Sequence, residues 1–362
     1  MATKPIGVGI IGANPERGWA KNAHIPALKA LPSHYELRAL STSRRESAEA
    51  ASREFGVALA FDNAAALVAR PEVDMVVVSV KVPQHRELVT AALHAGKDVF
   101  CEWPLGNGLA EAEQLAALAR ERGVRTLVGL QARASPGVRY VRDLIAQGFV
   151  GEVLSTSLVG SGGIGGATID RANAYVLDER NGANMLTISF GHTVDALCWC
   201  LGEFREVGAT LATRRPSVTL AGTSETVAQT SPDQVAVTGV LTSGAIASLH
   251  YRGGTSRGTN LLWEINGTHG DLVLTASSGH PQVDTVSISG GNGERPFGPL
   301  SIPERYTTAP GSPPGGAFNV AQLYAQFAAD THASPTFEDA VVRHRLIHAI
   351  QEAARSGERQ QL

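Results

Sequence analysis

The first residues able to do chemistry form a glycine-containing turn, Gly12-Ala13-Asn14-Pro15-Glu16-Arg17-Gly18-Trp19. An apolar run over 6–11 precedes this turn, and a helical apolar pattern over 21–31 follows it. A strand, a tight turn and a helix together present free backbone N–H groups where a pyrophosphate can bind. We therefore predict a dinucleotide-binding unit whose phosphate contacts come from Gly12, Ala13, Asn14, Gly18 and Trp19.

A literal match to Gly-x-Gly-x-x-Gly lies slightly earlier, at Gly7-Val8-Gly9-Ile10-Ile11-Gly12. No strand precedes it and no helix follows it at once, so we interpret it as the strand itself. The loop after it departs from the fingerprint, because Asn14 stands at the second glycine position and Gly18 comes late. Asn tolerates left-handed backbone geometry better than most residues. An ordinary turn of an α/β protein remains the alternative.

The end of the second predicted strand, 35–40, indicates which dinucleotide binds. NAD enzymes usually place an acidic residue there, on the ribose 2′-hydroxyl. Here the chain reads Ser41-Thr42-Ser43-Arg44-Arg45. Hydroxyls followed by guanidinium groups suit a 2′-phosphate, so we predict NADP(H) in preference to NAD(H), with contacts from Ser41, Ser43, Arg44 and Arg45. The alternative is a helix N-cap serine followed by solvated arginines.

The first half of the chain must position these residues, and it alternates strand and helix patterns. Strands are predicted over 57–61, 74–80, 98–102 and 125–130, and helices over 44–55, 63–69, 83–95 and 110–122. This order predicts a Rossmann-type, doubly wound parallel sheet with ligands at the carboxyl ends of its strands. At or next to those ends lie further residues that we predict to contact the cofactor: Ser79, Val80, Lys81, Pro83, His85, Glu102, Trp103, Pro104 and Gln131.

The second half changes character and predicts an α+β domain with a largely antiparallel open sheet, exposed on one face. Its strand patterns cover 153–159, 206–212, 234–241, 245–251, 261–266, 271–275 and 283–288. Helices are predicted over 136–147, 183–201, 318–331 and 337–355, and an irregular loop over the Gly/Pro/Ser-rich segment 289–316. We place the domains at 1–131 and 132–362. An uncovered sheet face suits a homodimer or a dimer of dimers with two-fold symmetry, the alternative being a monomer with a polar outer face.

Composition excludes several classes of function. A net charge of −3 and 43% hydrophobic residues indicate neither a nucleic-acid surface nor a membrane-binding stripe. No apolar run approaches the roughly 20 residues that span a bilayer. The chain opens on a strand rather than a signal peptide, and its three cysteines favour a reducing compartment, so we expect a cytoplasmic protein without a metal site.

Several longer motifs carry a family resemblance. A dinucleotide domain, a Pro-containing loop after an apolar strand and a Cys-Glu-x-Pro turn resemble the glucose–fructose oxidoreductase/inositol dehydrogenase/rhizopine-catabolism family over nearly the whole chain. Within it, the sequence is most similar to the subgroup of the yeast galactose-regulon repressor. The segments that carry this closer resemblance are Met75–Pro83, Glu102-Trp103, Leu130–Pro136, Ser189–Asp195, Ser231-Pro232-Asp233 and Gly267–Leu272.

The departures from this family concern its acid–base groups. Catalytic members read Glu-Lys-Pro where this chain has Glu102-Trp103-Pro104, and they carry an Asp where this chain has Ile188. The resemblance therefore retains only His192 of the usual Lys–Asp–His set. Trp103 cannot donate a proton at neutral pH, but it can stack on a nicotinamide or close the pocket.

From these residues we predict a site in the second half. His192 is the candidate acid–base group, because its ordinary pKa lies near neutrality, and Lys81 is the second candidate. Arg133 and Tyr175 could hold substrate hydroxyls, and Asp195 could orient His192 or touch substrate. Each has an alternative: His192 as a packing histidine, Lys81 as a backbone or phosphate contact, Trp103 as a core residue.

Two functions remain. In the first, the chain is an oxidoreductase that transfers a hydride between NADP(H) and a sugar-like alcohol or ketone, a substrate class that only the resemblance implies. In the second, it is a non-catalytic, NADP-responsive regulatory protein, as the repressor subgroup implies.

Overall fold

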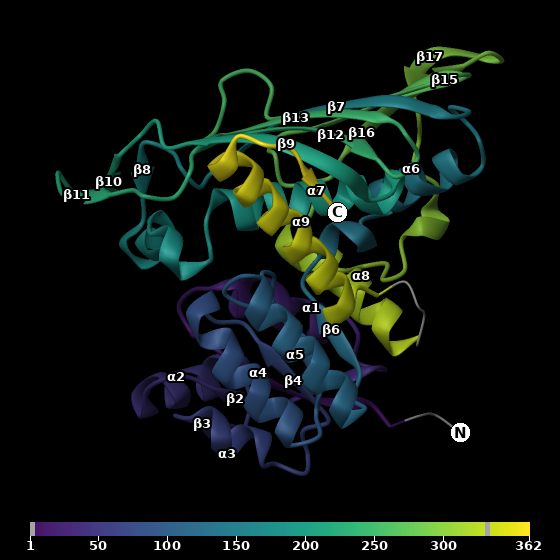
Figure 1. The fold of residues 1–362 in the computed structure, drawn as a ribbon. Helices are drawn as coiled ribbons and strands as arrows, with labels where there is room; N and C mark the ends of the chain where they lie inside the picture. Colours follow the sequence, from purple (N-terminus) through teal and green to yellow (C-terminus); the bar gives the residue numbers. More distant parts are fainter. Residues whose placement is uncertain (1–3, 330–333) are drawn as a thin grey trace. The chain divides into compact units, whose positions relative to one another are not determined.

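The computed structural model describes residues 4–329 and 334–362 (Figure 1). The chain divides into two compact units, Met1–Ala134 with Thr307–Val342, and Ser135–Tyr306 with Arg343–Leu362. Each unit is described by itself below. The fold class predicted from the sequence is confirmed: a parallel Rossmann sheet in the first unit and a mostly antiparallel sheet in the second.

The first unit contains a six-stranded sheet in the order β3-β2-β1-β4-β5-β6, with every neighbouring pair parallel. Its strands are β1 (Ile6–Ile11), β2 (Tyr35–Ser41), β3 (Leu59–Phe61), β4 (Met75–Val78), β5 (Asp98–Cys101) and β6 (Thr126–Val128). The unbroken apolar run of β4 is fully buried, as a central parallel strand requires. The Gly7–Gly12 match lies within and just after β1, which confirms its interpretation as strand.

Helices of the first unit follow the predicted alternation. They are α1 (Ile25–Lys29), entered through a π-helical segment Ala20–His24, then α2 (Arg45–Phe55), α3 (Ala64–Val68), α4 (His85–His94) and α5 (Leu109–Arg122). Left-handed glycines end two of them: Gly56 has a φ of +74° and Gly123 a φ of +65°.

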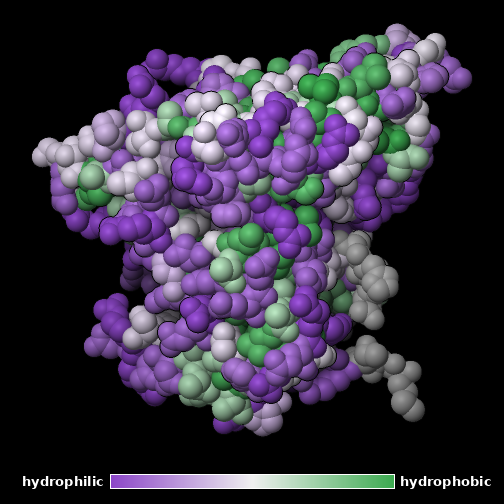
Figure 2. All heavy atoms as spheres, in the orientation of Figure 1, coloured by the Kyte–Doolittle hydropathy of each residue, from purple (hydrophilic) through white to green (hydrophobic). Residues whose placement is uncertain are grey.

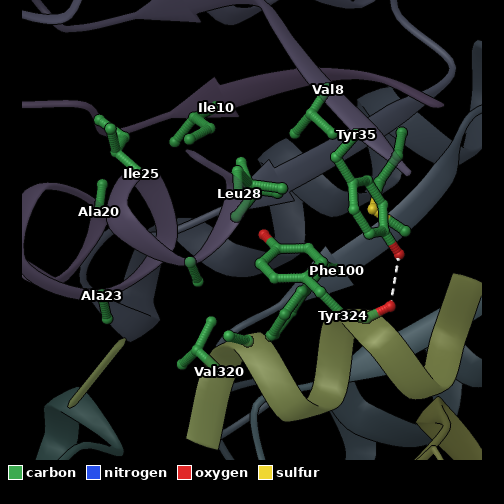
Figure 3. Packing of buried hydrophobic residues seen from close by; sticks show 14 of the residues in the cluster. Val8, Ile10, Ala20, Ala23, Ile25, Leu28, Tyr35, Phe100, Val320 and Tyr324 are labelled. Atoms are coloured by element: carbon green, nitrogen blue, oxygen red, sulfur yellow. Dashed lines mark hydrogen bonds between the residues drawn. The ribbon is translucent and has the colours of Figure 1, made fainter. Parts of the chain in front are cut away.

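A late segment, 307–342, belongs to the first unit. The predicted division at residue 131 places this segment in the second domain. Its helix α8 (Gly316–Ala328) packs Val320 and Tyr324 into the same core as Val8 and Phe100 (Figure 3). The Tyr35 hydroxyl donates to the Tyr324 carbonyl at 2.8 Å. Burial of this apolar face explains why α8 belongs to the first core. The predicted helix over 318–331 extends past α8, and its last two residues lie outside the described residues.

The second unit is built on a nine-stranded sheet, in the order β17-β16-β15-β14-β7-β13-β12-β9-β18. Its β7–β13 pair is parallel and the other pairs are antiparallel. The strands are β7 (Val153–Gly162), β9 (Phe204–Ala212), β12 (Gln234–Leu241), β13 (Ile246–Gly253), β14 (Leu261–Gly267), β15 (Gly270–Ala276), β16 (Ser287–Asn292), β17 (Arg295–Pro299) and β18 (Gln360–Gln361).

Burial alternates along β12 and β13, so one sheet face is packed and the other is exposed. Helices α6 (Pro136–Ala146) and α7 (Gly191–Leu201) lie on one side of this sheet in Figure 1. Helix α9 (Phe337–Ser356) spans the boundary between the units.

The predicted irregular loop over 289–316 is wrong in its first part, because β16 and β17 pair there as a hairpin. The predicted strand over 283–288 is shifted, since β16 begins at Ser287. Glycine weakens strand propensity, but a Cβ on Gly290 would lie 2.6 Å from a Leu272 methyl carbon. Packing against β15 therefore selects glycine inside a real strand.

Two further features were not predicted. A three-stranded sheet of β8 (Thr168–Ile169), β10 (Ser217–Leu220) and β11 (Thr226–Ala228) lies outside the large sheet. The helical stretch predicted over 183–201 begins with a π-helical segment, Met185–Phe190, before α7. The Asn184 side chain caps it by accepting the backbone N–H groups of Leu186 and Thr187.

Polar and charged residues dominate the face drawn in Figure 2, with hydrophobic residues in small patches. Within 4–329 and 334–362, no helix combines the length and the apolar character needed to cross a membrane.

Candidate functional site

In the first unit, the sheet opens between β1 and β4, where the strand order reverses. Gly12 follows β1 with a φ of +96°, and a Cβ there would lie 2.3 Å from the Ser79 carbonyl oxygen. The N–H groups of Gly12 and Ala13 donate to the Ser41 carbonyl, at 2.9 and 3.2 Å. Glycine is therefore required on two counts, and the Ser41 main chain fixes the turn from the next strand. The Ser41 side chain is buried.

Asn14 organises the rest of this turn. Its Oδ1 accepts the N–H groups of Glu16 and Arg17, at 2.9 and 3.1 Å, which caps the loop where the fingerprint has glycine. Trp19 packs against Gly316, where a Cβ would lie 2.6 Å from the Trp19 ring. The turn thus has a defined form, in which the N–H groups of Gly12, Ala13, Glu16 and Arg17 already donate within the protein.

The segment after β2 exposes the predicted 2′-phosphate contacts. Ser43, Arg44 and Arg45 are all exposed. Arg45 donates to Glu49 at 2.7 Å, one helical turn away. The Arg44 side chain has neither an ion pair nor a hydrogen bond among the described residues, which leaves it available to an anion.

Glu102, just after β5, is the centre of a buried polar network. His24 Nε2 lies 2.8 Å from one carboxylate oxygen, and Gln131 Nε2 lies 3.0 Å from the other. His24 Nδ1 lies 2.8 Å from the Tyr324 hydroxyl. The structure therefore brings the predicted residues Glu102 and Gln131 together, and it adds His24, which sequence reasoning missed.

The residues after β4 divide into exposed and buried ones. Lys81 and Pro83 are exposed at a short 3₁₀ turn. His85 is buried, with its ring nitrogens 2.9 Å from the Pro104 carbonyl and 3.1 Å from the Val80 carbonyl. Its position assigns it to holding these two loops rather than to touching a cofactor, and burial lowers its pKa.

Two other predicted residues of the first unit are largely buried. Trp103 is 4% exposed and precedes Pro104 through a cis peptide bond. Arg133 donates from Nη1 to Asp339 at 2.7 Å. Its charge is therefore already paired before any substrate hydroxyl approaches.

In the second unit, His192 lies in the first turn of α7 and is 6% exposed. Its Nδ1 is buried and has no hydrogen-bond partner within the described part of the chain. Burial, and then the neighbouring His280 imidazole, lower the pKa of His192 to about 3, although Asp195 opposes the shift. The ring is therefore neutral near pH 7, and its lone pair can accept a hydrogen bond, although burial makes it a weaker base than an ordinary histidine.

Asp195 is fully buried and belongs to an ion-pair cluster. Arg343, also fully buried, donates from Nε to Asp195 at 3.1 Å and from Nη1 to Cys198 Sγ at 3.1 Å. Its Nη2 donates to Glu203 at 2.8 Å. Asp195 therefore supports α7 from within and has no surface through which to touch a substrate.

Tyr175 and Ile188 are brought together in the wall of a pocket of about 410 Å³. Polar groups of Asp170 and Asn173 line the same pocket. Burial raises the pKa of Tyr175, so its hydroxyl stays protonated and can donate a hydrogen bond. The position of the family's Asp is thus part of a cavity wall here, but as an apolar group.

Sequence reasoning missed two further groups beside His192. Ser189 is completely buried, with its hydroxyl lacking a partner in the described residues. His280 lies in the loop after β15 and is close enough to His192 to lower its pKa. The spacing of Ser189 and His192, three residues apart on one helical face, was the signal available for the first. The Ser-Ser-Gly-His-Pro loop gave no pattern for the second.

Both halves of the chain are similar to known proteins. Residues 6–130 match the model of an oxidoreductase family with an NAD-binding Rossmann fold, and residues 136–276 match that of the Gal80p C-terminal domain. Dehydrogenase aclE of Aspergillus oryzae is 32% identical over 373 residues, which cover 98% of each chain. The chain belongs to the Gfo/Idh/MocA oxidoreductase family.

Other members of the Gfo/Idh/MocA family are regulators. The galactose/lactose metabolism regulatory protein GAL80 of Saccharomyces cerevisiae is 28% identical over 399 residues, covering 96% of this chain and 92% of its own. The crystal structure of one super-repressor mutant of that protein superimposes with a TM-score of 0.89 at 27% identity, over 99% of this chain and 98% of the other.

Proposed function

We propose that this protein is an NADP(H)-dependent oxidoreductase that transfers a hydride between its cofactor and an uncharged, sugar-like alcohol or ketone. One observation carries the proposal: His192 keeps the family's acid–base position and is buried with Nδ1 unpartnered among the described residues. A histidine retained only for packing normally has a hydrogen-bond partner. An unpartnered one suits a ligand.

The first unit would hold the cofactor. The Gly12–Asn14 turn would lie beside the pyrophosphate at the end of β1, and glycine is needed at 12 because a Cβ would collide with the Ser79 carbonyl. Ser43 and Arg44 are exposed where the 2′-phosphate of NADP is expected. When bound, the nicotinamide supplies the hydride chemistry.

The second unit would handle the proton. With its pKa lowered to about 3, His192 is neutral at physiological pH and can take the proton of an alcohol during oxidation. Tyr175 would hold a substrate hydroxyl from the pocket wall. Asp195 would help to hold α7, and with it His192, in place. Lys81 remains the second acid–base candidate, Arg133 a candidate substrate contact, and Trp103 a stacking or pocket-closing group.

A regulatory protein without turnover is the second candidate. The match of residues 136–276 to the Gal80p C-terminal domain favours it, as do Trp103 and Ile188 in place of the family's Lys and Asp. Loss of a group that stabilises a developing alkoxide typically costs a few kcal/mol of barrier. In that case nucleotide occupancy would bias a protein–protein contact.

Single-turnover kinetics separate the two candidates. The protein, in excess over each member of a panel of sugar alcohols, ketoses and imines, is mixed with NADP⁺ or NADPH, and absorbance is followed near 340 nm. His192→Ala should lower the rate roughly 10²-fold or more without changing NADPH affinity. His250→Ala, at an exposed position of β13, is the matched control and should change neither. Silence across the panel, together with a cofactor-dependent protein partner, contradicts the enzyme.

We also infer a two-fold homodimer through the exposed face of the large sheet. Thr238, Ser248, Ser157 and Glu264 form one exposed cross-strand row there, and Ile246 is 56% exposed nearby. Small hydroxyl-bearing side chains allow two flat sheets to approach. A monomeric mass by light scattering at micromolar concentration would contradict this. The three cysteines are buried and form no disulfide in the described residues, which supports a reducing, cytoplasmic location.

A further inference from the structure

His280 and Ser189 face the same point on β7. A Cβ placed on Gly162 would lie 3.0 Å from both Cε1 and Nε2 of His280, and 3.1 Å from the Ser189 hydroxyl. These three residues come from different parts of the second unit: the end of β7, the loop after β15, and the helical stretch before α7. Glycine at 162 therefore lets the His280 imidazole and the Ser189 hydroxyl approach the same point of β7, with no room there for a side chain.

The loop that holds His280 is pinned by its neighbours. The Gly279 carbonyl accepts the hydroxyls of Thr193 and Tyr251, at 3.0 and 2.8 Å. The Gly279 N–H donates to the Ser161 carbonyl at 2.9 Å. Because α7, β13 and β7 each contribute one contact, the ring of the next residue is positioned by the core of the unit rather than by an independent surface loop.

Asp284 fixes the other end of the same loop. Its Oδ2 accepts both the Ser277 hydroxyl and the Ser278 N–H, at 2.7 Å each. The Gln282 amide nitrogen lies 3.2 Å from His280 Nδ1. Nδ1 is therefore engaged by Gln282, which leaves Nε2, the atom beside Gly162, as the ring nitrogen that can meet a ligand.

Polar atoms without protein partners converge on this region. Among the described residues, neither the Ser189 hydroxyl nor His192 Nδ1 has a hydrogen-bond partner, although both are buried. Residues three apart on a helix share a face, so these two side chains are neighbours. Buried polar atoms are nearly always satisfied, by protein or by a bound molecule. These two buried atoms can therefore be satisfied by the polar atoms of a ligand.

The charges around the two imidazoles keep both neutral. His192 faces His280 and Asp195, and His280 faces His192 and Asp284. Burial is the largest influence on each ring and lowers both pKa values, while each aspartate opposes the shift of its own histidine. Two neighbouring imidazoles cannot readily both be cationic. The pair can therefore take up one proton, not two.

We propose that Ser189, His192 and His280 together bind the reacting oxygen of an uncharged alcohol or carbonyl substrate, with His280 as a second acid–base group in contact with it. This inference rests on the proposed oxidoreductase function. In the oxidation direction, the carbinol C–H bond breaks and its hydride leaves for the nicotinamide. The O–H proton passes to one imidazole nitrogen, and the C=O bond forms. The other ring and the Ser189 hydroxyl donate hydrogen bonds to the new carbonyl oxygen, and the proton then leaves to solvent.

This arrangement offers a neutral substitute for the charged lysine and aspartate that the chain lacks. A neutral pair binds hydroxyl and carbonyl oxygens without requiring charge on the substrate. It also couples the two histidines, so a change at one must alter the titration of the other. That coupling can be measured without any turnover.

The experiment compares His280→Asn with His250→Asn, a control at an exposed histidine of β13. Imidazole titrations are followed by NMR on the full-length protein. In His280→Asn the pKa of His192 should rise from about 3, and in the control it should not move. An unchanged His192 titration in His280→Asn overturns the pair.

Ligand and turnover arms complete the test. Uncharged polyols and ketoses of three to six carbons should shift the resonances of His192 and His280 together, and Ser189→Val should weaken that response at least tenfold. In single turnover, His280→Asn should lower the rate about 10- to 100-fold and alter its pH profile, at unchanged NADPH affinity. Joint resonance shifts without turnover in the parent protein would contradict the proposed oxidoreductase but support the binding site. No joint shift with any probe overturns the site.

Discussion

The two units hold their candidate groups in different ways. In the first, the backbone of the turn and the Glu102 carboxylate have protein partners: the Ser41 carbonyl accepts two N–H groups, and Glu102 meets both His24 and Gln131, while Trp19 Nε1 and Gln131 Oε1 have no partner in the described residues. In the second, the Ser189 hydroxyl and His192 Nδ1 are buried without partners in the described residues. The first site can keep its form without a ligand, whereas the second is completed by one.

This difference has an energetic meaning. A buried polar group without a partner costs about 1–3 kcal/mol. A substrate that satisfies such groups recovers part of that cost, so specificity is expected from the second unit more than from the first. The buried Arg343 cluster holds Asp195, one turn after His192, and so supports α7 from within.

The largest expected effect comes from removing that support. Arg343→Met leaves the fully buried Asp195 without its cation, and uncompensated buried charges typically cost about 3–5 kcal/mol. We expect a loss of this size in the free energy of unfolding, measured by urea denaturation.

Arg343→Lys should lose less unfolding free energy than Arg343→Met but remain less stable than the parent protein. It keeps the charge but loses the planar fork that reaches three acceptors. Arg45→Met is the surface control, since its pair with Glu49 is exposed, and it should change stability by less than about 1 kcal/mol. Equal losses for Arg343→Met and Arg45→Met would show that the α7 support is not needed.

The second effect tests whether the first unit depends on backbone form. Gly12→Ala must adopt a φ of +96°, costing about 1–2 kcal/mol, and must also place a Cβ 2.3 Å from the Ser79 carbonyl oxygen. Together these should cost about 2–4 kcal/mol and abolish NADPH binding measured by nucleotide fluorescence.

Gly56→Ala, at the end of α2 and outside the predicted phosphate loop, is the matched control. Its φ is +74°, but no neighbouring atom lies within 4 Å of the added Cβ. It should therefore carry the backbone cost alone and retain NADPH binding. If the two variants bind equally well, the close approach of β1 to β4 has no role in the cofactor site.

Sequence patterns predicted those parts of the molecule that periodicity or a local turn determines. The unbroken apolar run Met75–Val78 indicated a central parallel strand, and alternation in β12 and β13 indicated a sheet with one exposed face. Gly12 was recognisable because a strand before it and a helix after it define the turn. Each of these signals lies within about ten residues of chain.

The rest depends on contacts between distant segments. Position at the end of a strand marked both Lys81 and His85, yet only the carbonyls of Val80 and Pro104 show that His85 is enclosed. An amphipathic pattern located α8 but not the core that it joins. His280 acquires its place only through Gly162 and Ser189, which no local pattern links to it.

The smallest expected effect concerns the one feature of the first site that relies on exposed side chains. Arg44→Ala should weaken NADPH binding about tenfold, or about 1.4 kcal/mol, and leave NADH binding unchanged, as measured by calorimetry. Arg45→Ala should have less effect, because Glu49 already engages its guanidinium group at 2.7 Å. Arg53→Ala, in the last turn of the same helix, controls for the loss of one charge.

Because exposed charges are screened by salt, the preference for NADPH should shrink as ionic strength rises, whereas the backbone contacts of Gly12 should be less sensitive. Equal affinities of the parent protein for NADPH and NADH would remove the 2′-phosphate argument. If Arg44→Ala loses equal affinity for both nucleotides, Arg44 contributes general electrostatic attraction rather than specificity for the 2′-phosphate.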